Sequence, residues 1–331
     1  MLQLVTKKYP RNPGRNILLV IIVLLSSLCS DAFAQEDFKK VGTTGFGFLE
    51  LPVTARQLGM ADALVASESP SANAVFTNPA GLANISNRHS FSASYGPWLV
   101  DMTHSAFSYG LNMGMYGHMG IHGIWLDMGT MQRTVFDPTA VGGFRDAGQF
   151  SAGAGALGIT YARRMTDQFA FGGNIKYVQE TIDNYEATNV LIDIGTLYNT
   201  GFGSFRIGTN IQNFGLESQF IGDVFKMPIT FLVGGAMEVI GSQTSANRLT
   251  VSLSAVHPSN YTERVHLGGE YVWQNLVSLR GGYKWNYDEQ SWAVGAGVHT
   301  SVGGNKIILN GGYSTLGRLG SVMRWTIEIS I

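Results

Sequence analysis

The sequence has 331 residues, a formal net charge of −1 and one cysteine. A single cysteine excludes a disulfide framework, and a near-neutral charge provides no basic surface for nucleic acid. Only 14% of the residues are charged, against about 25% in ordinary soluble domains, and the 42 glycines are nearly twice the average share. This composition favours β-strands.

Residues 1–34 have the features of a secretory signal peptide. Four basic residues precede the uncharged apolar run Ile17–Leu25, and Ala32-Phe33-Ala34 supplies small residues at the cleavage positions, which predicts Gln35 as the mature start. A membrane anchor is the alternative, but the apolar run has about a dozen residues and a spanning helix needs about twenty. Lipidation at Cys29 is a second alternative, disfavoured by the large residue before it. Cleavage would leave a mature chain without cysteine, and therefore without a thiolate metal site or a cysteine nucleophile.

Residues 35–87 do not show the strand pattern of the rest of the chain, and they are too few for a separate domain with its own core. Leu58–Ala66 fits either a short helix or a short strand, and Ala72–Ala83 is a turn-rich run of small residues. A segment of this kind before the first strand of a barrel is expected to fold inward as a plug. We therefore predict an N-terminal hatch segment over residues 35–87.

Within this segment, Asn78, Pro79, Ala80 and Gly81 form the motif that most strongly indicates a function. Pro79 fixes one backbone angle and lacks an N–H donor, and the Asn78 amide can bond neighbouring backbone groups. The small Ala80 and Gly81 allow a close approach to a barrel wall. Two hypotheses stay open: displacement of the plug gates the lumen, or the plug is static and only adds stability.

From about Arg88 onward, apolar and polar residues alternate over some fourteen candidate strands. Each strand alone is a weak signal, but the repetition is typical of a transmembrane barrel, in which lipid-facing and lumen-facing residues alternate. The polar faces carry Lys176, Lys226, Thr230, Glu238, Ser252, His266, Glu270, Arg280 and Lys284. A secreted all-β sandwich is the alternative. We predict an all-β fold, a transmembrane antiparallel barrel of about fourteen strands over residues 88–331, in the outer membrane of a Gram-negative bacterium.

The predicted connections alternate between short and longer ones. The longer set, which outer-membrane barrels place outside the cell, includes residues 127–148, 180–188 and 213–225. Two predicted outer turns carry apolar side chains, and exposed apolar clusters often mark interaction sites. The candidate partner-binding residues in these turns are Trp98, Leu99, Phe214, Phe220 and Phe225. The alternative is that these loops pack over the barrel mouth.

The last eight residues, Arg324–Ile331, alternate without a break and place Trp325 on the apolar face. A strand puts successive side chains on opposite faces, so this segment has one apolar and one polar face. We expect it to be the last strand of the barrel, paired with the first strand near His89–Tyr95.

Several segments resemble the N-terminal signature of the PorV/PorQ family, which belongs with the FadL-like outer-membrane barrels. These segments are Phe46–Pro52, Ala55–Ala63, Ala72–Ala74 and Asn78–Ala83. The triplet Asn78-Pro79-Ala80 is similar to the hatch motif of FadL-type channels. The chain departs from the family at Ala61, where glycine is common.

The resemblance implies a fourteen-stranded barrel with an N-terminal hatch. PorV-like members act in type IX secretion, where they receive the signal domain of cargo, and PorQ-like members are grouped with the surface-attachment machinery. FadL-type members pass hydrophobic small molecules laterally into the membrane. The same fold therefore serves different functions, and the resemblance alone does not select one.

No pattern in the sequence indicates catalysis or a metal site. The seven histidines lie in no recognisable nucleophile motif, and His118 and His122, four apart on one strand, fit a polar lumen lining better than a metal site. We predict no catalytic residue, no metal and no cofactor.

The leading hypothesis is a non-enzymatic component of type IX protein secretion, of the PorV/PorQ type, that binds cargo signal domains or secretion-system subunits. The alternatives are a FadL-like channel for hydrophobic small molecules and a structural barrel scaffold. Outer-membrane lipid surrounds the protein in each case, and no nucleic-acid partner is expected.

Overall fold

The computed structural model describes residues 42–68 and 70–331, so the predicted signal peptide over 1–34 and the start of the predicted hatch segment lie outside the described residues. Over the described ranges, fourteen antiparallel strands close into one barrel, which confirms the predicted fold class. The barrel strands are β1 (His89–Pro97), β2 (Thr103–Asn112), β3 (His118–Phe136), β4 (Phe144–Arg164), β5 (Phe169–Ile182), β6 (Tyr185–Asn199), β7 (Arg206–Phe214), β10 (Thr230–Ile240), β11 (Arg248–Pro258), β12 (Arg264–Trp273), β13 (Val277–Trp285), β14 (Trp292–Val302), β15 (Asn305–Thr315) and β16 (Ser321–Ser330). Two short strands, β8 (Ser218–Gln219) and β9 (Val224–Phe225), pair with each other between β7 and β10.

The barrel closes through the pairing of β1 with β16. The register runs from Ser90 opposite Ser330 to Tyr95 opposite Trp325, which confirms the expected partner of the last strand. Along β16, Arg324 points into the lumen and is buried, whereas Trp325 points outward and is 60% exposed. The same alternation on the other strands gives the barrel an apolar outer face and a largely polar inner face.

None of the helices in residues 42–68 and 70–331 combines the length and the apolar character that a membrane span requires.

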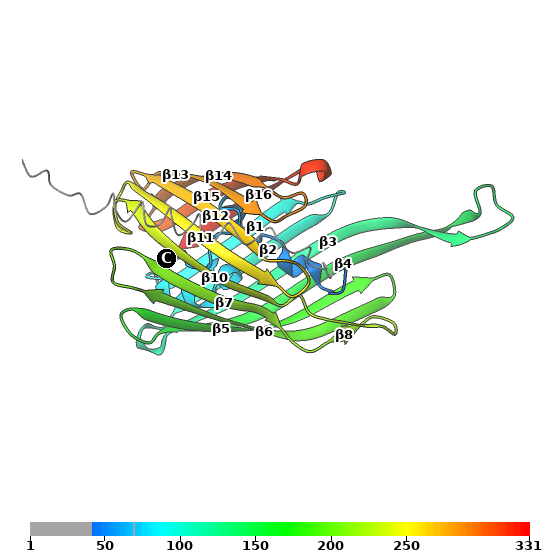
Figure 1. Cartoon of the computed structure of the whole chain (residues 1–331), viewed down its shortest axis with the longest axis horizontal. Helices are drawn as coiled ribbons and strands as arrows, with labels where there is room; N and C mark the ends of the chain where they lie inside the picture. Colours follow the sequence, from blue (N-terminus) through cyan, green and yellow to red (C-terminus); the bar gives the residue numbers. More distant parts are fainter. Residues whose placement is uncertain (1–41, 69) are drawn as a thin grey trace, which may run out of the picture. The chain divides into compact units, whose positions relative to one another are not determined.

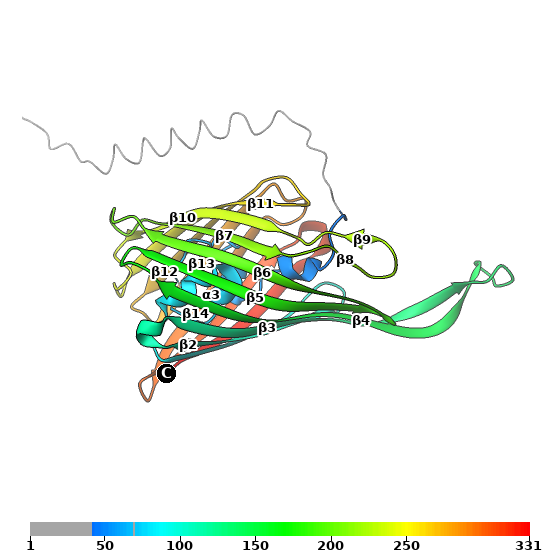
Figure 2. The same ribbon diagram turned by 90° about the horizontal axis from the view of Figure 1, so that it is seen from below.

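Strands β3 and β4 continue past their neighbours as a two-stranded ribbon (Figures 1 and 2). Strand β3 pairs with β2 only as far as Asp127, but its pairing with β4 continues to Phe136 opposite Phe144. The predicted longer connection over 127–148 therefore does extend past the neighbouring strands, but most of it is strand and not loop. We call the barrel end with this ribbon the surface end and the opposite end the periplasmic end, because outer-membrane barrels place their longer connections outside the cell.

The predicted loop over 180–188 is also wrong. Strand β5 ends at Ile182 and β6 begins at Tyr185, so the connection is a tight turn at Asp183 and Asn184. Polar residues occupy both faces of the hairpin near this turn, which removes the alternation that marks a lipid-facing strand, although the backbone pairing continues.

The N-terminal segment, residues 42–68 and 70–87, lies largely inside the barrel and contains four short helical turns (Figure 2). They are η1 (Gly47–Glu50), α2 (Ala55–Gly59), α3 (Ala74–Thr77) and η2 (Pro79–Asn84). Thr54 caps α2, its hydroxyl accepting a hydrogen bond from the backbone N–H of Gln57 at 3.1 Å. After α2 the chain turns sharply, with φ of 49° at Ala61 and 59° at Asp62. A left-handed backbone is most easily adopted by glycine, which gives a physical reason for glycine at the position of Ala61 in the resembling family.

Candidate functional site

Asn78 ties the N-terminal segment to the barrel wall. Its side chain is buried, and the amide Nδ2 donates hydrogen bonds to the carbonyl oxygens of Val65 (2.8 Å), Thr196 on β6 (3.0 Å) and Thr209 on β7 (3.3 Å). The amide Oδ1 accepts from the backbone N–H of Ala80 at 3.1 Å, at the start of η2. One side chain thus connects two parts of the segment with two strands of the wall.

The rest of the motif fits against glycines of the wall. A Cβ on Gly195 of β6 would lie 2.0 Å from Asn78 Oδ1, and a Cβ on Gly172 of β5 would lie 2.4 Å from the Ala80 nitrogen and equally close to the Pro79 carbonyl carbon. The structure therefore places the predicted motif against β5, β6 and β7. Gating by displacement of this motif stays a prediction.

We expect Asn78→Asp to destabilise the protein more than Asn78→Ala. Alanine removes a buried donor and leaves its acceptors unpaired, a loss of about 1–3 kcal/mol. Aspartate places a carboxylate oxygen against the same carbonyl oxygens and adds electrostatic repulsion. Urea unfolding in detergent micelles, followed by tryptophan fluorescence, measures the difference. The control is Asn286→Asp at an exposed turn, and equal unfolding midpoints for all variants and wild type would contradict the expectation.

Inward-facing glycines surround the segment, and we call this set the glycine belt. At each position an added Cβ would contact residues between 55 and 85; the positions are Gly110, Gly120, Gly172, Gly195, Gly208, Gly234, Gly268, Gly282, Gly295 and Gly312. On Gly208 the Cβ would lie 2.2 Å from the carbonyl oxygen of Val65, and on Gly312 it would lie 2.5 Å from that of Ala55. Glycine in a strand permits such a close approach of another backbone. Part of the high glycine content therefore comes from fitting the wall to the segment.

Ion pairs also join the segment to the wall. Arg56 Nη2 lies 2.7 Å from Glu270 Oε2 on β12, and Arg280 Nε on β13 lies 2.6 Å from the other Glu270 oxygen. Asp62 pairs with Lys284 on β13. The side chains of all five residues are at most 16% exposed, so an unpaired charge among them would be poorly solvated. These pairs therefore connect the segment to β12 and β13 at two places.

Other polar side chains of the wall bind the backbone of the segment. Arg324 Nη1 donates to the carbonyl oxygen of Val53, and Arg206 Nε donates to that of Ala66, both at 3.0 Å. A segment with little regular structure must find partners for its backbone groups elsewhere. The inward polar faces of the strands supply these partners.

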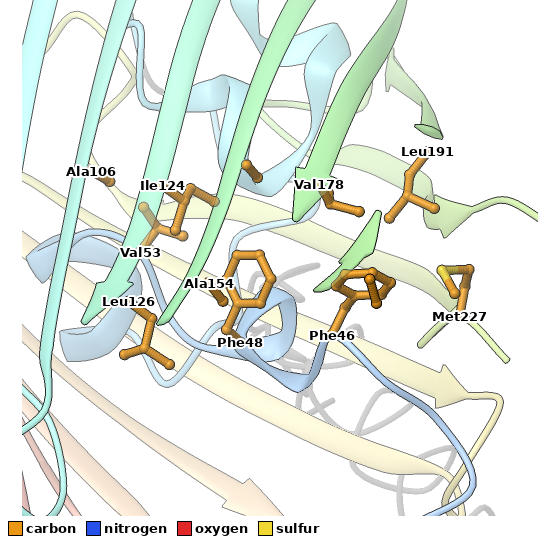
Figure 3. Packing of buried hydrophobic residues seen from close by; sticks show 12 residues of the cluster. Phe46, Phe48, Val53, Ala106, Ile124, Leu126, Ala154, Val178, Leu191 and Met227 are labelled. Atoms are coloured by element: carbon orange, nitrogen blue, oxygen red, sulfur yellow. The ribbon is translucent and has the colours of Figure 1, made fainter. Parts of the chain in front are cut away.

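An apolar cluster occupies the surface end of the lumen, and we call it the mouth cluster (Figure 3). Phe46 and Phe48 of the segment are buried there against inward side chains of β2 to β6. The wall members are Ala106, Ile124, Leu126, Ala154, Ala156, Val178, Ala187 and Leu191. Phe225 packs edge-on against Phe46 from the β7–β10 connection, with 5.7 Å between ring centroids. The surface end of the lumen is therefore apolar, in contrast to the polar face farther inside.

A chamber of about 100 Å³ lies beside the mouth cluster, between the segment and the wall. Its lining combines apolar side chains such as Leu51 and Phe76 with polar ones such as His122 and Lys176. Lys176 Nζ lies 2.8 Å from Asp193 Oδ2, whereas His122 Nδ1 has no hydrogen-bond partner among the described residues. Polar and charged side chains outnumber the apolar ones in this lining, so the chamber has a mixed character.

A larger cavity of about 660 Å³ lies at the periplasmic end, and charged and polar side chains provide most of its lining. The segment contributes residues to both cavities. Gln57 and Asp62 line the chamber, whereas Arg56 and Ser67 line the periplasmic cavity. The segment therefore lies between the two ends of the lumen.

The five predicted docking residues lie in different surroundings. Trp98 and Leu99 are half-buried and pack over α2, and Phe220 and Phe225 pack on the mouth cluster with ring centroids 5.7 Å apart. Phe214 is 58% exposed. Four of the five thus contribute to packing over the barrel mouth, and a partner-binding role for any of them stays a prediction.

His118 and His122 are both buried on the lumen side, and the His118 Nε2 lies 3.0 Å from the carbonyl oxygen of Ile85. Within the part of the chain that the structure describes, no group of three or more histidine, cysteine, aspartate or glutamate side chains is placed to hold a metal ion.

Sequence reasoning placed Glu270, Arg280 and Lys284 on the lumen face but did not find their partners. Arg56 and Asp62 are charged residues within an otherwise mostly apolar run of the predicted hatch segment, and this is the signal that could have pointed to buried ion pairs.

No protein-family model matches the chain, and no curated protein matches it. Solved structures do match. The toluene transporter TbuX of Ralstonia pickettii has a TM-score of 0.57 at 12% identity, over 83% of this chain and 96% of that one. The toluene transporter TodX of Pseudomonas putida has a TM-score of 0.56 at 12% identity, over 85% and 98%. A FadL homologue of Pseudomonas aeruginosa has a TM-score of 0.54 at 12% identity, over 84% and 97%.

At these identities the likeness establishes the fold. The chain is a multi-pass outer-membrane β-barrel protein, with fourteen barrel strands in the described residues and an apolar outer face, and its fold is similar to that of FadL-type barrels.

Proposed function

We propose that the protein is a channel that passes a hydrophobic small molecule from the cell surface into the outer membrane, with the N-terminal segment as its hatch. The observation that carries this proposal is that the mouth cluster reaches β4, where two outward-facing neighbours of its members have no side chains. Ala154 and Ala156 belong to the cluster and point inward, and their neighbours Gly153 and Gly155 point outward without side chains. An apolar solute in the mouth cluster is separated from lipid there by little more than one strand backbone.

The pairing of β3 with β4 supports a lateral path at this place. Its register shifts between Asp127 and Thr130, directly beside the pair of Asp127 with Gly153. A bulge disrupts the ladder locally and bends the strand. The segment lies across the direct path to the periplasm, so a sideways exit fits this barrel better than a straight one.

The similarity in fold to known transporters supports the proposal that the transported solute is small and apolar. TbuX and TodX are described as toluene transporters, and CymD as a monoaromatic hydrocarbon channel. Since one fold can serve several functions, the mouth cluster and not the likeness carries the proposal. A channel of this kind is non-enzymatic.

Uptake of radiolabelled toluene by a Gram-negative host, with and without the protein, tests the proposal. We expect the protein to raise the initial uptake rate several-fold, and Ala154→Phe to return it to near the vector level by filling the inner face of β4. Ile159→Phe, on the outer face of the same strand and outside the region of Gly153 and Gly155, is the matched control and is expected to keep the wild-type rate. Equal uptake by cells with wild-type protein and with vector, when heat-modifiable migration shows a folded barrel, would contradict the proposal.

A PorV/PorQ-type role in type IX secretion is the second candidate. The motif resemblance and the exposed β3–β4 ribbon favour it, because Phe136 at 83% and Phe144 at 55% exposure offer apolar contacts outside the barrel. Co-purification from the native outer membrane distinguishes the roles. Recovery of secretion subunits or cargo signal domains would favour secretion, and failure of both assays would leave a structural barrel scaffold.

A further inference from the structure

A groove of about 400 Å³ lies on the outer surface of the barrel, across β3, β4 and β5. Its floor is Gly153 and Gly155 of β4, which point outward. The strand register places a side chain on either side of each glycine. Asp127 and Thr181 flank Gly153, and Trp125 and Gln179 flank Gly155.

The end of the groove that lies nearer the periplasmic end of the barrel is apolar. One step further along β4, Leu157 stands opposite Tyr177 of β5, and these side chains are 52% and 46% exposed. Strands β3 and β5 are two strand spacings apart, about 10 Å, so the flanking side chains leave room for one extended hydrocarbon chain. The groove is therefore a trough that runs from a polar rim toward an apolar membrane face.

Packing within the protein does not require glycine at these two positions. A Cβ on Gly153 would lie 3.4 Å from its nearest neighbour, the carbonyl oxygen of Leu126, and a Cβ on Gly155 would lie 3.4 Å from Trp125 Cδ1. Both are ordinary contacts, unlike those of the glycine belt, and neither residue has a positive φ. Glycine weakens a strand, and in such positions it often marks the approach of a ligand.

The surface around the groove is the apolar outer face, so the molecules that reach it are membrane lipids. The polar rim holds a carboxylate, an amide and a hydroxyl in Asp127, Gln179 and Thr181, and no basic side chain is among the groove-lining residues that the structure describes. Such a rim suits a headgroup that carries hydrogen-bond donors, an amine or hydroxyls, and disfavours a bare phosphate.

We infer that this groove is a lipid-binding site, in which one acyl chain of an outer-membrane lipid lies on Gly153 and Gly155 and a donor-bearing headgroup bonds the rim at Asp127. The inference does not depend on the proposed channel function, because a barrel that transports nothing would present the same groove to lipid.

Native mass spectrometry of the delipidated full chain, titrated with dioleoylphosphatidylethanolamine in detergent micelles, tests the inference. We expect one saturable bound lipid per wild-type chain, at least tenfold weaker binding by the G153L/G155L variant, and weaker binding of the matched phosphatidic acid by wild type. Gly281→Leu is the control, since Gly281 also points outward and has no atom within 4 Å of an added Cβ, and it is expected to bind like wild type.

Gly155→Ala keeps the test decisive if the double variant does not fold, because one added Cβ fits at that position. We expect this variant to bind the lipid about threefold more weakly than wild type. Equal affinities for wild type, G155A and G281L would overturn the inference. Dimers of wild type that Gly155→Ala abolishes would overturn it as well and would assign the groove to a second copy of the chain.

Discussion

Glu270→Ala is expected to lower the free energy of unfolding by about 3 kcal/mol, the low end of the cost of breaking a buried ion pair. Glu270 accepts from both Arg56 and Arg280, so its removal leaves two guanidinium groups in the lumen without their shared carboxylate. Arg280 keeps bonds to Ser278 and Asn310, and the periplasmic cavity beside the cluster admits water. Both facts place the loss at the low end.

Urea unfolding in detergent micelles measures this change through the tryptophan fluorescence. Glu263→Ala is the matched control, because Glu263 pairs with His257 at 3.0 Å but its side chain is 67% exposed, and an exposed pair contributes at most about 1 kcal/mol. If the pair fixes the segment, Glu270→Ala also raises single-channel conductance in planar bilayers. An unfolding midpoint unchanged from wild type would show that Arg56 and Glu270 do not hold the segment.

Replacement of a glycine of the glycine belt by valine is expected to lower the free energy of unfolding by a similar amount. On Gly208 or Gly312 the new Cβ would lie within 2.5 Å of a backbone oxygen of the segment, and backbone cannot rotate away as a side chain can. Overpacking usually costs about 1–3 kcal/mol, and contact with backbone places these variants at the upper end. We expect the segment, and not the wall, to move, because each strand of the wall is hydrogen-bonded to a neighbouring strand on both sides.

Limited proteolysis of the purified variants measures this displacement. We expect Gly208→Val and Gly312→Val to expose cleavage sites between residues 42 and 87, and to raise single-channel conductance if the segment blocks the lumen. Gly281→Val is the control, because an added Cβ at that outward position meets no atom within 4 Å. Protease resistance equal to wild type in both belt variants would contradict the expectation. A displaced segment with unchanged conductance would contradict the gating hypothesis, but it would still agree with a role of the glycine belt in holding the segment.

The strand series could be predicted because lipid and lumen impose opposite polarities on alternate residues. The prediction of strand ends was wrong where the chain leaves the region between lipid and lumen. Thr181 pairs with Glu186, and the β3–β4 ribbon lies past the barrel rim, so the alternation that marks a lipid-facing strand is lost there. Pro228 shows a different limit: it has no N–H to donate, and β10 begins only at Thr230, although the apolar alternation starts at Met227.

The site was harder to predict than the wall. Periodicity tells which face of a strand a residue occupies, but not its height in the lumen or which part of the segment it meets. The Asn78 motif was found because proline, asparagine and small residues have local conformational preferences. Its three carbonyl partners lie on three separate stretches of the chain, and no local pattern specifies them.

The contacts of the segment have a consequence for the order of folding. The backbone N–H of Ala55 bonds Thr326 of β16, and these residues are separated by 271 positions in the chain. Contacts between residues so distant in sequence form slowly, because the chain entropy lost on closing the loop must be overcome first. The segment is synthesised before every strand of the barrel, yet it cannot complete its bonds until the last strand has joined. Barrel closure and docking of the segment are therefore expected to be one cooperative and late step.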